Sequence, residues 1–170
     1  AAATAHLREL GHRVIAHIAG PESSYAAAER ERGWRETLAE AGFRYGVLLR
    51  GAWDSASGYR AGLELLTNID ASDPVTAVVV ANDQMALGVL RAASELGILV
   101  PEQLSVVGFD DVADAANFTP ALTTVRQRFD LLGQRAVAAV LDGAEAGSRE
   151  VIDAPLVVRG SSAAPFVQPA

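Results

Sequence analysis

The stretch that decides the fold reads TAVVVAND at 76–83, VVGFDD at 106–111 and LTTVRQ at 122–127. Its first two apolar, β-branched runs end abruptly in polar pairs, Asn82-Asp83 and Asp110-Asp111. Buried strands of a parallel sheet are continuous apolar runs, and ligands bind at the carboxyl ends of such strands. The sequence therefore predicts two hydrogen-bonding clusters at one edge of one sheet, where a small polar ligand can be held.

Helical and extended patterns alternate on both sides of this stretch. Apolar residues at helical spacing, several followed by a glycine, predict helices at 1–10, 25–41, 58–68, 82–96 and 129–141. Short apolar segments predict strands at 14–18, 45–49, 76–81, 104–108, 122–125 and 151–158. Strands that alternate with helices predict an α/β fold with a mainly parallel sheet flanked by helices.

The composition limits the function classes. The 170-residue chain is 50% hydrophobic, which is enough to bury one core, and its length suggests one domain. Its net charge is −7 and its 14 Lys and Arg residues are interleaved with acids, which argues against direct binding to nucleic-acid phosphates. With 0 Cys, disulfides and thiolate metal sites are excluded. Since no apolar run approaches a membrane span, we expect a soluble acidic domain.

Five motifs occur in the order and spacing of one known family. They are LRELGHRVI at 7–15, ERERGW at 29–34, ANDQMALG at 81–88, VGFDD at 107–111 and LTTV at 122–125. Through these motifs nearly the whole chain resembles the ligand-binding core of the lactose-repressor/galactose-repressor (LacI/GalR) transcription regulators. The resemblance implies a periplasmic-binding-protein-like type I fold, in which two α/β lobes linked by three crossovers bind an effector between them.

The resemblance also implies how the chain is divided. The family's N-terminal helix-turn-helix, its hinge and most of its first lobe are expected to be missing, whereas the C-terminal lobe is essentially complete. Residues 1–20 are expected to be a remnant of the N-terminal lobe and residues 21–127 the C-terminal lobe. Residues 128–155 would be a returning segment of the N-terminal lobe, and 156–170 a tail on the C-terminal lobe.

Asn82 and Asp110 are the first candidates for ligand contact. The amide of Asn82 can both donate to and accept from a sugar hydroxyl, and the carboxylate of Asp110 can accept from two vicinal hydroxyls. The alternatives are a helix N-cap for Asn82 and a turn residue for Asp110. Asp83 is expected to be the cap or a structural partner. Asp111 is expected to point away from Asp110, which disfavours a paired-carboxylate acid/base site.

Family position adds four more candidates for ligand contact. Arg30 offers a planar guanidinium to hydroxyls or to a carboxylate, although its highly charged helix also fits a solvated face. Trp53 and Phe129 can cover the apolar face of a sugar ring. The alternative for both is core packing, and Phe129 shares helical spacing with Leu132. Gln127, which precedes Phe129, completes the set.

Leu87 and Phe118 match positions that the family uses for side-by-side dimers. Leu87 lies on the predicted helix 82–96, and Phe118 lies in the long loop after Asp110. A helix that is apolar on more than one face must bury its second face against something. The alternative is that both side chains belong to the core of a single subunit.

Three function classes remain to be weighed. The resemblance implies the sensor domain of a cytoplasmic transcription regulator that binds a sugar or a related metabolite and forms a homodimer. Operator DNA would be bound only through the missing N-terminal domain, and neither cofactor, metal nor membrane is expected. A periplasmic sugar-binding protein of a transporter has the same fold, but the ANDQMALG and LTTV motifs favour the regulator. An enzyme is not indicated, because no phosphate-binding glycine loop, nucleophile elbow or metal-ligand cluster is present.

Overall fold

The computed structural model describes residues 1–68, 74–143 and 150–166. It contains α-helices, strands and one short 3₁₀ helix in an alternating order. The helices are α1 (Ala2–Glu9), α2 (Tyr25–Glu40), α3 (Ser55–Thr67), α4 (Asp83–Glu95), the 3₁₀ helix η1 (Ala113–Asn117) and α5 (Phe129–Leu141). The strands are β1 (Ile15–Ala19), β2 (Leu48–Arg50), β3 (Ala77–Val80), β4 (Ser105–Asp110), β5 (Thr123–Arg126) and β6 (Leu156–Val157).

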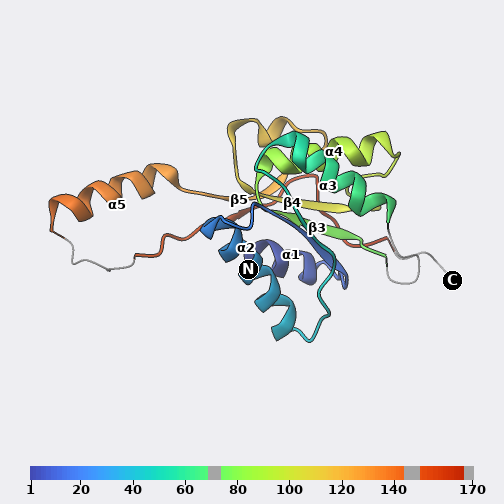
Figure 1. Ribbon diagram of the computed structural model, residues 1–170, viewed down its shortest axis with the longest axis horizontal. Helices are drawn as coiled ribbons and strands as arrows, with labels where there is room; N and C mark the ends of the chain where they lie inside the picture. The colour runs from blue at the N-terminus through green and yellow to red at the C-terminus, as the bar shows by residue number, and fades with distance from the viewer. Residues whose placement is uncertain (69–73, 144–149, 167–170) are drawn as a thin grey trace.

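The six strands form one sheet in the order β2-β1-β3-β4-β5-β6. All neighbours are parallel except β5 and β6, which are antiparallel. Helices α3 and α4 cover one face of the sheet, and α1 and α2 cover the other (Figure 1). The predicted α/β fold with a mainly parallel sheet flanked by helices is therefore confirmed.

Each face of the sheet buries its own apolar core, which explains why the strands are apolar without alternation. The α3–α4 core contains Val78, Val80 and Val106 together with Met85 and Val89 from α4, among others. On the α1–α2 side, the neighbouring strand residues pack instead against the helical side chains Leu7, Trp34 and Leu38. Because the strands are covered on both faces, polar groups can emerge only at their ends, and this is where the candidate site lies.

Helices α3 and α4 cross at very short range. A Cβ atom on Gly88 would lie 2.1 Å from the carbonyl oxygen of Ser55 and 2.4 Å from the amide nitrogen of Tyr59. A Cβ atom on Gly58 would likewise lie 2.2 Å from the carbonyl oxygen of Met85. Glycine at 58 and 88 therefore allows the two backbones to touch, which fixes how α4 lies on the sheet.

The predicted division of the chain needs one correction. Residues 1–20 do not form part of a separate lobe, because β1 is paired with β2 on one side and with β3 on the other. Strand β1 is thus internal to the single sheet, and all five of its residues are buried. Residues 144–149 and 167–170, which belong to two predicted segments, lie outside the described residues, and the other boundaries stay predictions.

Helix α5 lies to one side of the sheet, away from the other helices (Figure 1), and none of its residues is buried. Extended segments at 127–128 and 150–155 connect this region to β5 and β6, and we call them, together with α5, the arm. The predicted helix 129–141 is confirmed, but its apolar stripe is exposed, with Val137 60% and Val140 82% accessible. Helix α5 therefore adds nothing to the two cores of the sheet, and of the arm only Ala154, in the returning segment, packs against one of them.

Residues 159–163, which we call the C-terminal strap, are hydrogen-bonded across the end of the sheet. The Ser161 hydroxyl donates to the Val106 carbonyl at 2.6 Å and accepts from the Thr123 amide at 2.8 Å. The buried ring of His12 contacts the Ala163 carbonyl oxygen at 2.8 Å through Nε2. His12 thus has a structural role, since it holds the strap, and the strap joins β4 to β5.

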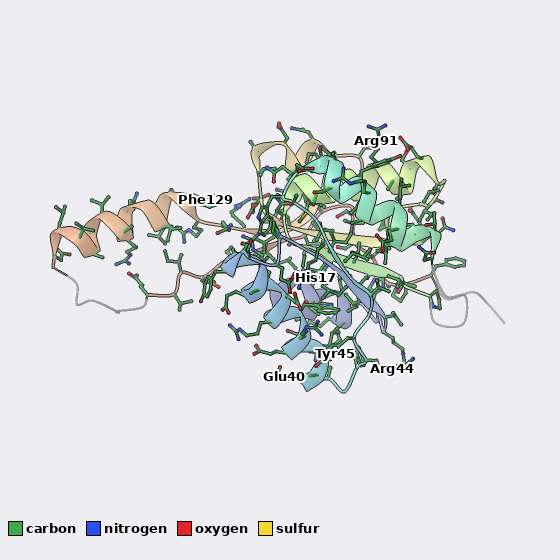
Figure 2. All side chains as sticks on the ribbon, in the orientation of Figure 1. His17, Glu40, Arg44, Tyr45, Arg91 and Phe129 are labelled. Carbon is green, nitrogen blue, oxygen red and sulfur yellow. The ribbon has the colours of Figure 1, made fainter. Side chains whose placement is uncertain are left out.

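His17 on β1 is a buried titratable group with one unsatisfied atom. Its Nδ1 donates to the Val79 carbonyl at 2.8 Å, whereas its Nε2 has no partner within the described residues. Its ring stacks on the Trp34 ring with centroids 5.5 Å apart, at the centre of the molecule (Figure 2). Burial is the main cause that lowers the pKa of His17 to about 4.

This histidine predicts a loss of stability in mild acid. An unfolded histidine binds a proton near pH 6.5, but His17 stays neutral in the fold until about pH 4. The unfolded state therefore binds more protons between these values, and the free energy of unfolding falls as the pH falls through this window. We expect a loss of about 2 kcal/mol from this group between pH 7 and pH 5.

Urea unfolding of the protein and of His17→Leu at both pH values measures this contribution. The leucine variant should lose about 2 kcal/mol less between pH 7 and pH 5 than the parent protein. His6 and His12 are present in both proteins, so their contributions cancel in the comparison. Equal losses in the two proteins would show that His17 is not responsible.

Candidate functional site

Five of the six predicted ligand-binding residues gather at the carboxyl edge of the sheet. Asn82 follows β3, Asp110 ends β4 and Gln127 follows β5. Arg30 on α2 and Trp53 in the loop after β2 reach the same edge from the side. The predicted meeting of the two polar clusters at one sheet edge is therefore observed, although binding of a ligand by these residues stays a proposal.

Arg30 is the centre of this cluster. Its guanidinium donates to the carbonyl oxygen of Ala81, at the end of β3, and lies 3.4 Å from Oδ1 of Asp110. The same oxygen of Asp110 accepts a hydrogen bond of 2.6 Å from Nε2 of Gln127. Arg30 and Asp110 each keep 18% of the side chain exposed. The alternative of a solvated face does not fit Arg30, because its charge faces the sheet edge.

Burial shifts the pKa values of Arg30 and Asp110 more strongly than their mutual attraction does, and it disfavours the charged form of each. It lowers the pKa of Arg30, although Asp110 and Asp83 raise it, and it raises the pKa of Asp110, although Gln127 and Arg30 lower it. A guanidinium has five N–H donors and a carboxylate has about four acceptor sites, so each group can form hydrogen bonds beyond the contacts named above. Added polar contacts from a bound molecule would be strongly favourable here, which is typical of functional sites.

Two aromatic rings enclose the guanidinium of Arg30. Its Cζ lies 3.9 Å from the ring centroid of Phe109 and 5.4 Å from that of Trp53. The Trp53 backbone has φ = 72°, and a Cβ on Gly20 would lie 2.3 Å from the Trp53 ring. The ring therefore sits directly on the backbone at Gly20, and it remains partly accessible. Trp53 is placed to form an apolar wall beside the polar groups.

Asn82 serves as the N-cap of α4, as its alternative interpretation states. Its Oδ1 accepts from the Met85 amide at 3.0 Å, and its Nδ2 donates to the Trp53 carbonyl at 2.9 Å and to Oε1 of Gln84 at 3.0 Å. Both N–H donors of the amide are thus used within the chain. Only the bond to Gln84 joins two side chains, so a ligand hydroxyl would reach Asn82 by replacing Gln84.

Phe129 is separated from the rest of the cluster. It is the first residue of α5, lies at the base of the arm (Figure 2) and is 58% exposed. The alternative interpretation for Phe129 was core packing. It is wrong for this structure, because Phe129 and Leu132 both lie on α5, where no residue is buried. Phe129 remains a proposed ligand contact that the structure does not bring to Arg30.

The two remaining acids have structural partners. Asp83 is fully buried, and it accepts from the Thr124 hydroxyl at 2.6 Å and from the Val112 amide at 2.9 Å. Asp111 faces two arginines, with Oδ2 at 2.5 Å from Nε of Arg126 and Oδ1 at 2.7 Å from a terminal nitrogen of Arg159. Asp111 shares no partner with Asp110 among these contacts, and Asp83 is a structural partner rather than the cap, which is Asn82.

Leu87 and Phe118 differ in exposure. Leu87 is 42% exposed and lines a surface pocket of about 400 Å³ with Tyr59, Gly88 and Arg91. Arg91 points outward from α4, away from the sheet (Figure 2). Phe118 is partly buried against the α3–α4 core, as its alternative interpretation states. Leu87 is therefore available to another molecule.

A family model of periplasmic binding protein-like domains matches residues 4–162. The chain belongs to this family. The match includes every site residue named above, from Arg30 to Phe129. None of the helices in the described part of the chain combines the length and the apolarity needed to cross a membrane. Within those same residues no three His, Cys, Asp or Glu side chains meet as ligands for a metal ion.

Known relatives specify the branch to which this domain is similar. The lactose operon repressor of Klebsiella pneumoniae is 44% identical over 160 residues, which are 92% of this chain and 44% of that repressor. A dimeric Lac repressor with an 11-residue C-terminal deletion has a TM-score of 0.89 at 37% identity, covering 97% of this chain and 61% of that chain. The regulator CelR in complex with cellobiose has a TM-score of 0.83 at 38% identity, covering 94% of this chain and 50% of that chain.

These findings confirm the resemblance to the LacI/GalR regulators, and they favour it over the transport protein. The chain spans less than half the length of the K. pneumoniae repressor. What the whole protein does therefore has to be argued from the site.

The sequence analysis missed three groups at the site. They are the ring of Phe109, the amide of Gln84 and the carbonyl of Ala81. Phe109 precedes Asp110, and strict alternation along β4 would place them on opposite faces. The backbone of Asp110 has φ = 119°, so the strand leaves regular geometry there and both side chains reach Arg30. A carbonyl group leaves no signal in the sequence at all.

Proposed function

We propose that this chain is the effector-sensing, dimerising ligand-binding domain of a LacI-family DNA-binding transcriptional regulator, acting as a repressor in the cytoplasm. The observation that carries the proposal is the partly buried Arg30–Asp110–Gln127 cluster beside Trp53, where charged groups retain unused hydrogen-bonding capacity. Similarity to a lactose operon repressor and to a cellobiose-bound regulator supports a sugar as effector.

The roles of the side chains follow from their chemistry. Asp110 accepts from two adjacent hydroxyls, Arg30 donates to a hydroxyl or ring oxygen, and Gln127 supplies a further amide. Trp53 covers the apolar face of the sugar ring, as aromatic walls do in binding pockets. Asn82 joins these contacts once Gln84 is displaced, and Phe129 closes the pocket from the arm side.

A ligand bound here controls DNA only through a difference between two states. The effector would bind between this lobe and a second lobe, and it favours the arrangement of lobes that it contacts better. If that arrangement changes the operator affinity of the dimer, the two binding events are thermodynamically coupled. The chain has a net charge of −7 and its Lys and Arg residues are interleaved with acids, so in this proposal operator contact is made by a helix-turn-helix domain of the full-length protein.

The homodimer is proposed to form through the exposed pocket on α3 and α4. Leu87 presents an apolar side chain there beside Tyr59 and Arg91. Similarity to a dimeric Lac repressor supports this use of the surface. Phe118 would contribute from the loop that packs under the same layer.

The proposal is tested on the full-length protein with a panel of neutral mono- and disaccharides that includes lactose and cellobiose. Calorimetric titration should detect one site per subunit, and a saturating sugar should change the affinity for the operator by fivefold or more. Binding without any change in operator affinity would indicate a transport protein instead. Turnover of a sugar would indicate an enzyme, and either result would overturn the proposal.

A further inference from the structure

Asp111 lies where three segments of the chain meet. It follows Asp110 directly, and it contacts Arg126 at the end of β5 and Arg159 at the start of the C-terminal strap. Arg126 immediately precedes the segment that leaves the sheet for the arm. Arg159 follows β6, which is reached from the other connection of the arm (Figure 1). Asp111 therefore touches the chain beside both connections at once.

The contacts of Asp111 are short, and its carboxylate is sheltered from solvent. Its side chain is only 6% exposed, with the two arginines at 2.5 Å and 2.7 Å on separate oxygens. Arg159 also donates to the Leu122 carbonyl at 2.7 Å, which fixes it against the start of β5. Arg159 is the sheltered partner, with 17% of its side chain exposed, whereas Arg126 is 52% exposed, and loss of either would leave the sheltered carboxylate with fewer bonds. The cluster thus acts as one unit, which we call the Asp111 clamp.

Backbone contacts tie the same point to the candidate site. The amide of Gln127 donates to the Asp110 carbonyl at 3.2 Å, and the amide of Arg126 donates to the Pro155 carbonyl at 2.8 Å. These bonds join the loop, the outgoing connection and the returning connection side by side. A displacement of Asp110 would therefore reach both connections through one or two residues.

The loop at Asp110 and Asp111 has limited ways to move. The next amide, that of Val112, is held by buried Asp83 at 2.9 Å, and Asp110 pairs with Arg126 on the strand side. Between these anchors, Asp110 and Asp111 adopt φ = 119° and φ = 57°, a region that residues other than glycine rarely occupy. These two residues are therefore the irregular point of the loop between its two anchors.

We propose that Asp111 is a positioning residue that couples ligand contact at Asp110 to the orientation of the arm, through its paired bonds to Arg126 and Arg159. The inference rests on the proposed function, since it explains how binding at the site is transmitted. Asp111 does not touch the ligand. Its substitution therefore affects the response to the effector more than the affinity for the effector.

The test compares full-length Asp111→Asn with the parent protein, using the sugar that binds best in the panel described above. Asparagine keeps the shape but removes the charge that holds both arginines. We expect the effector dissociation constant to stay within about threefold, whereas the effector-induced change in operator affinity falls by fivefold or more. Arg159→Gln should reduce the effector-induced change in operator affinity by the same factor. The double variant should lose no more of this response than either single variant, because Asp111 and Arg159 belong to one interacting cluster.

A matched control separates this role from a general effect on stability. Glu36→Gln breaks an ion pair of Arg32 at 2.9 Å on the exposed face of α2, where Glu36 makes no contact with Asp111 or its two arginines, and should leave the response unchanged. Amide hydrogen exchange adds a readout that needs no ligand. Exchange at Arg126 and Val157 should be about tenfold faster in Asp111→Asn and unchanged in Glu36→Gln.

The outcomes are distinguishable from failure of the proposed function. If the parent protein responds to the sugar and Asp111→Asn responds equally, or exchanges at the same rates, the coupling role of Asp111 is wrong. If Asp111→Asn loses effector affinity as strongly as it loses the response, Asp111 belongs to the binding site and the proposal also fails. If the parent protein binds sugar with no change in operator affinity, the proposed function is wrong. The coupling role of Asp111, which rests on it, is then wrong as well.

Discussion

Replacing Asp110 with alanine is expected to weaken binding of the effector by about 10- to 100-fold, while operator binding without effector stays intact. The variant loses charge-assisted hydrogen bonds to ligand hydroxyls, each worth about 1.5–3 kcal/mol. It also leaves the half-buried guanidinium of Arg30 without its carboxylate, 3.4 Å away in the parent protein. Calorimetric titration and operator-binding assays on the full-length protein measure both quantities.

Two further variants separate the causes of this loss. Asp110→Asn keeps a side chain that tolerates the positive φ of this position, and it removes only the charge. Its affinity should lie between those of the parent protein and Asp110→Ala. Asp114→Ala removes an exposed acid from η1, four residues away, and should bind normally. If Asp110→Ala responds at the same effector concentration as the parent protein, Asp110 does not contact the effector.

Gly88→Ala should produce the largest loss of stability. The new methyl group would lie 2.1 Å and 2.4 Å from backbone atoms of Ser55 and Tyr59, so α3 as a whole must move away from α4. Overpacking of this kind costs about 3 kcal/mol, and more when the obstacle is backbone. For a chain of this size that corresponds to a fall in melting temperature of roughly 6–12 °C.

Gly133→Ala is the matched control for the same chemical change. Gly133 lies within α5, and a Cβ there meets nothing within 4 Å. Alanine favours a helix over glycine by about 1 kcal/mol, so this variant should be as stable as the parent protein or more stable. Thermal unfolding of the two variants side by side measures the difference. Similar melting temperatures for both would contradict the close approach of α3 and α4.

Where local signals and packing agree, the sequence predicted the fold well. Glycines at 11, 42 and 97 follow predicted helices, and each has the positive φ that ends a helix. The start of α3 was predicted less accurately. The predicted helix began at Gly58, whereas the observed helix begins at Ser55 and is capped by Asp54. Gly58 is a poor helix former, and only the contact with α4 explains its place inside the helix.

The candidate site shows the same limit. The polar pairs at the strand ends located it, since parallel strands end at one edge of a sheet. They could not show that the Asn82 amide is already used by Trp53 and Gln84, because those contacts join segments about 30 residues apart or depend on a side-chain rotamer. The sequence also could not show that β1 lies inside this sheet, because an apolar run does not reveal which strands it pairs with.

The position of the C-terminal strap has a consequence for synthesis on the ribosome. Each of the strands β2 to β5 pairs with a strand that has been made before it, so five strands can assemble as they emerge. β6 and the strap emerge only after the arm has been translated. During that interval β5 is an open sheet edge, the kind of edge that recruits foreign strands. Strand β6 closes this edge, and Arg159, two residues after β6, then completes the ion pairs of Asp111.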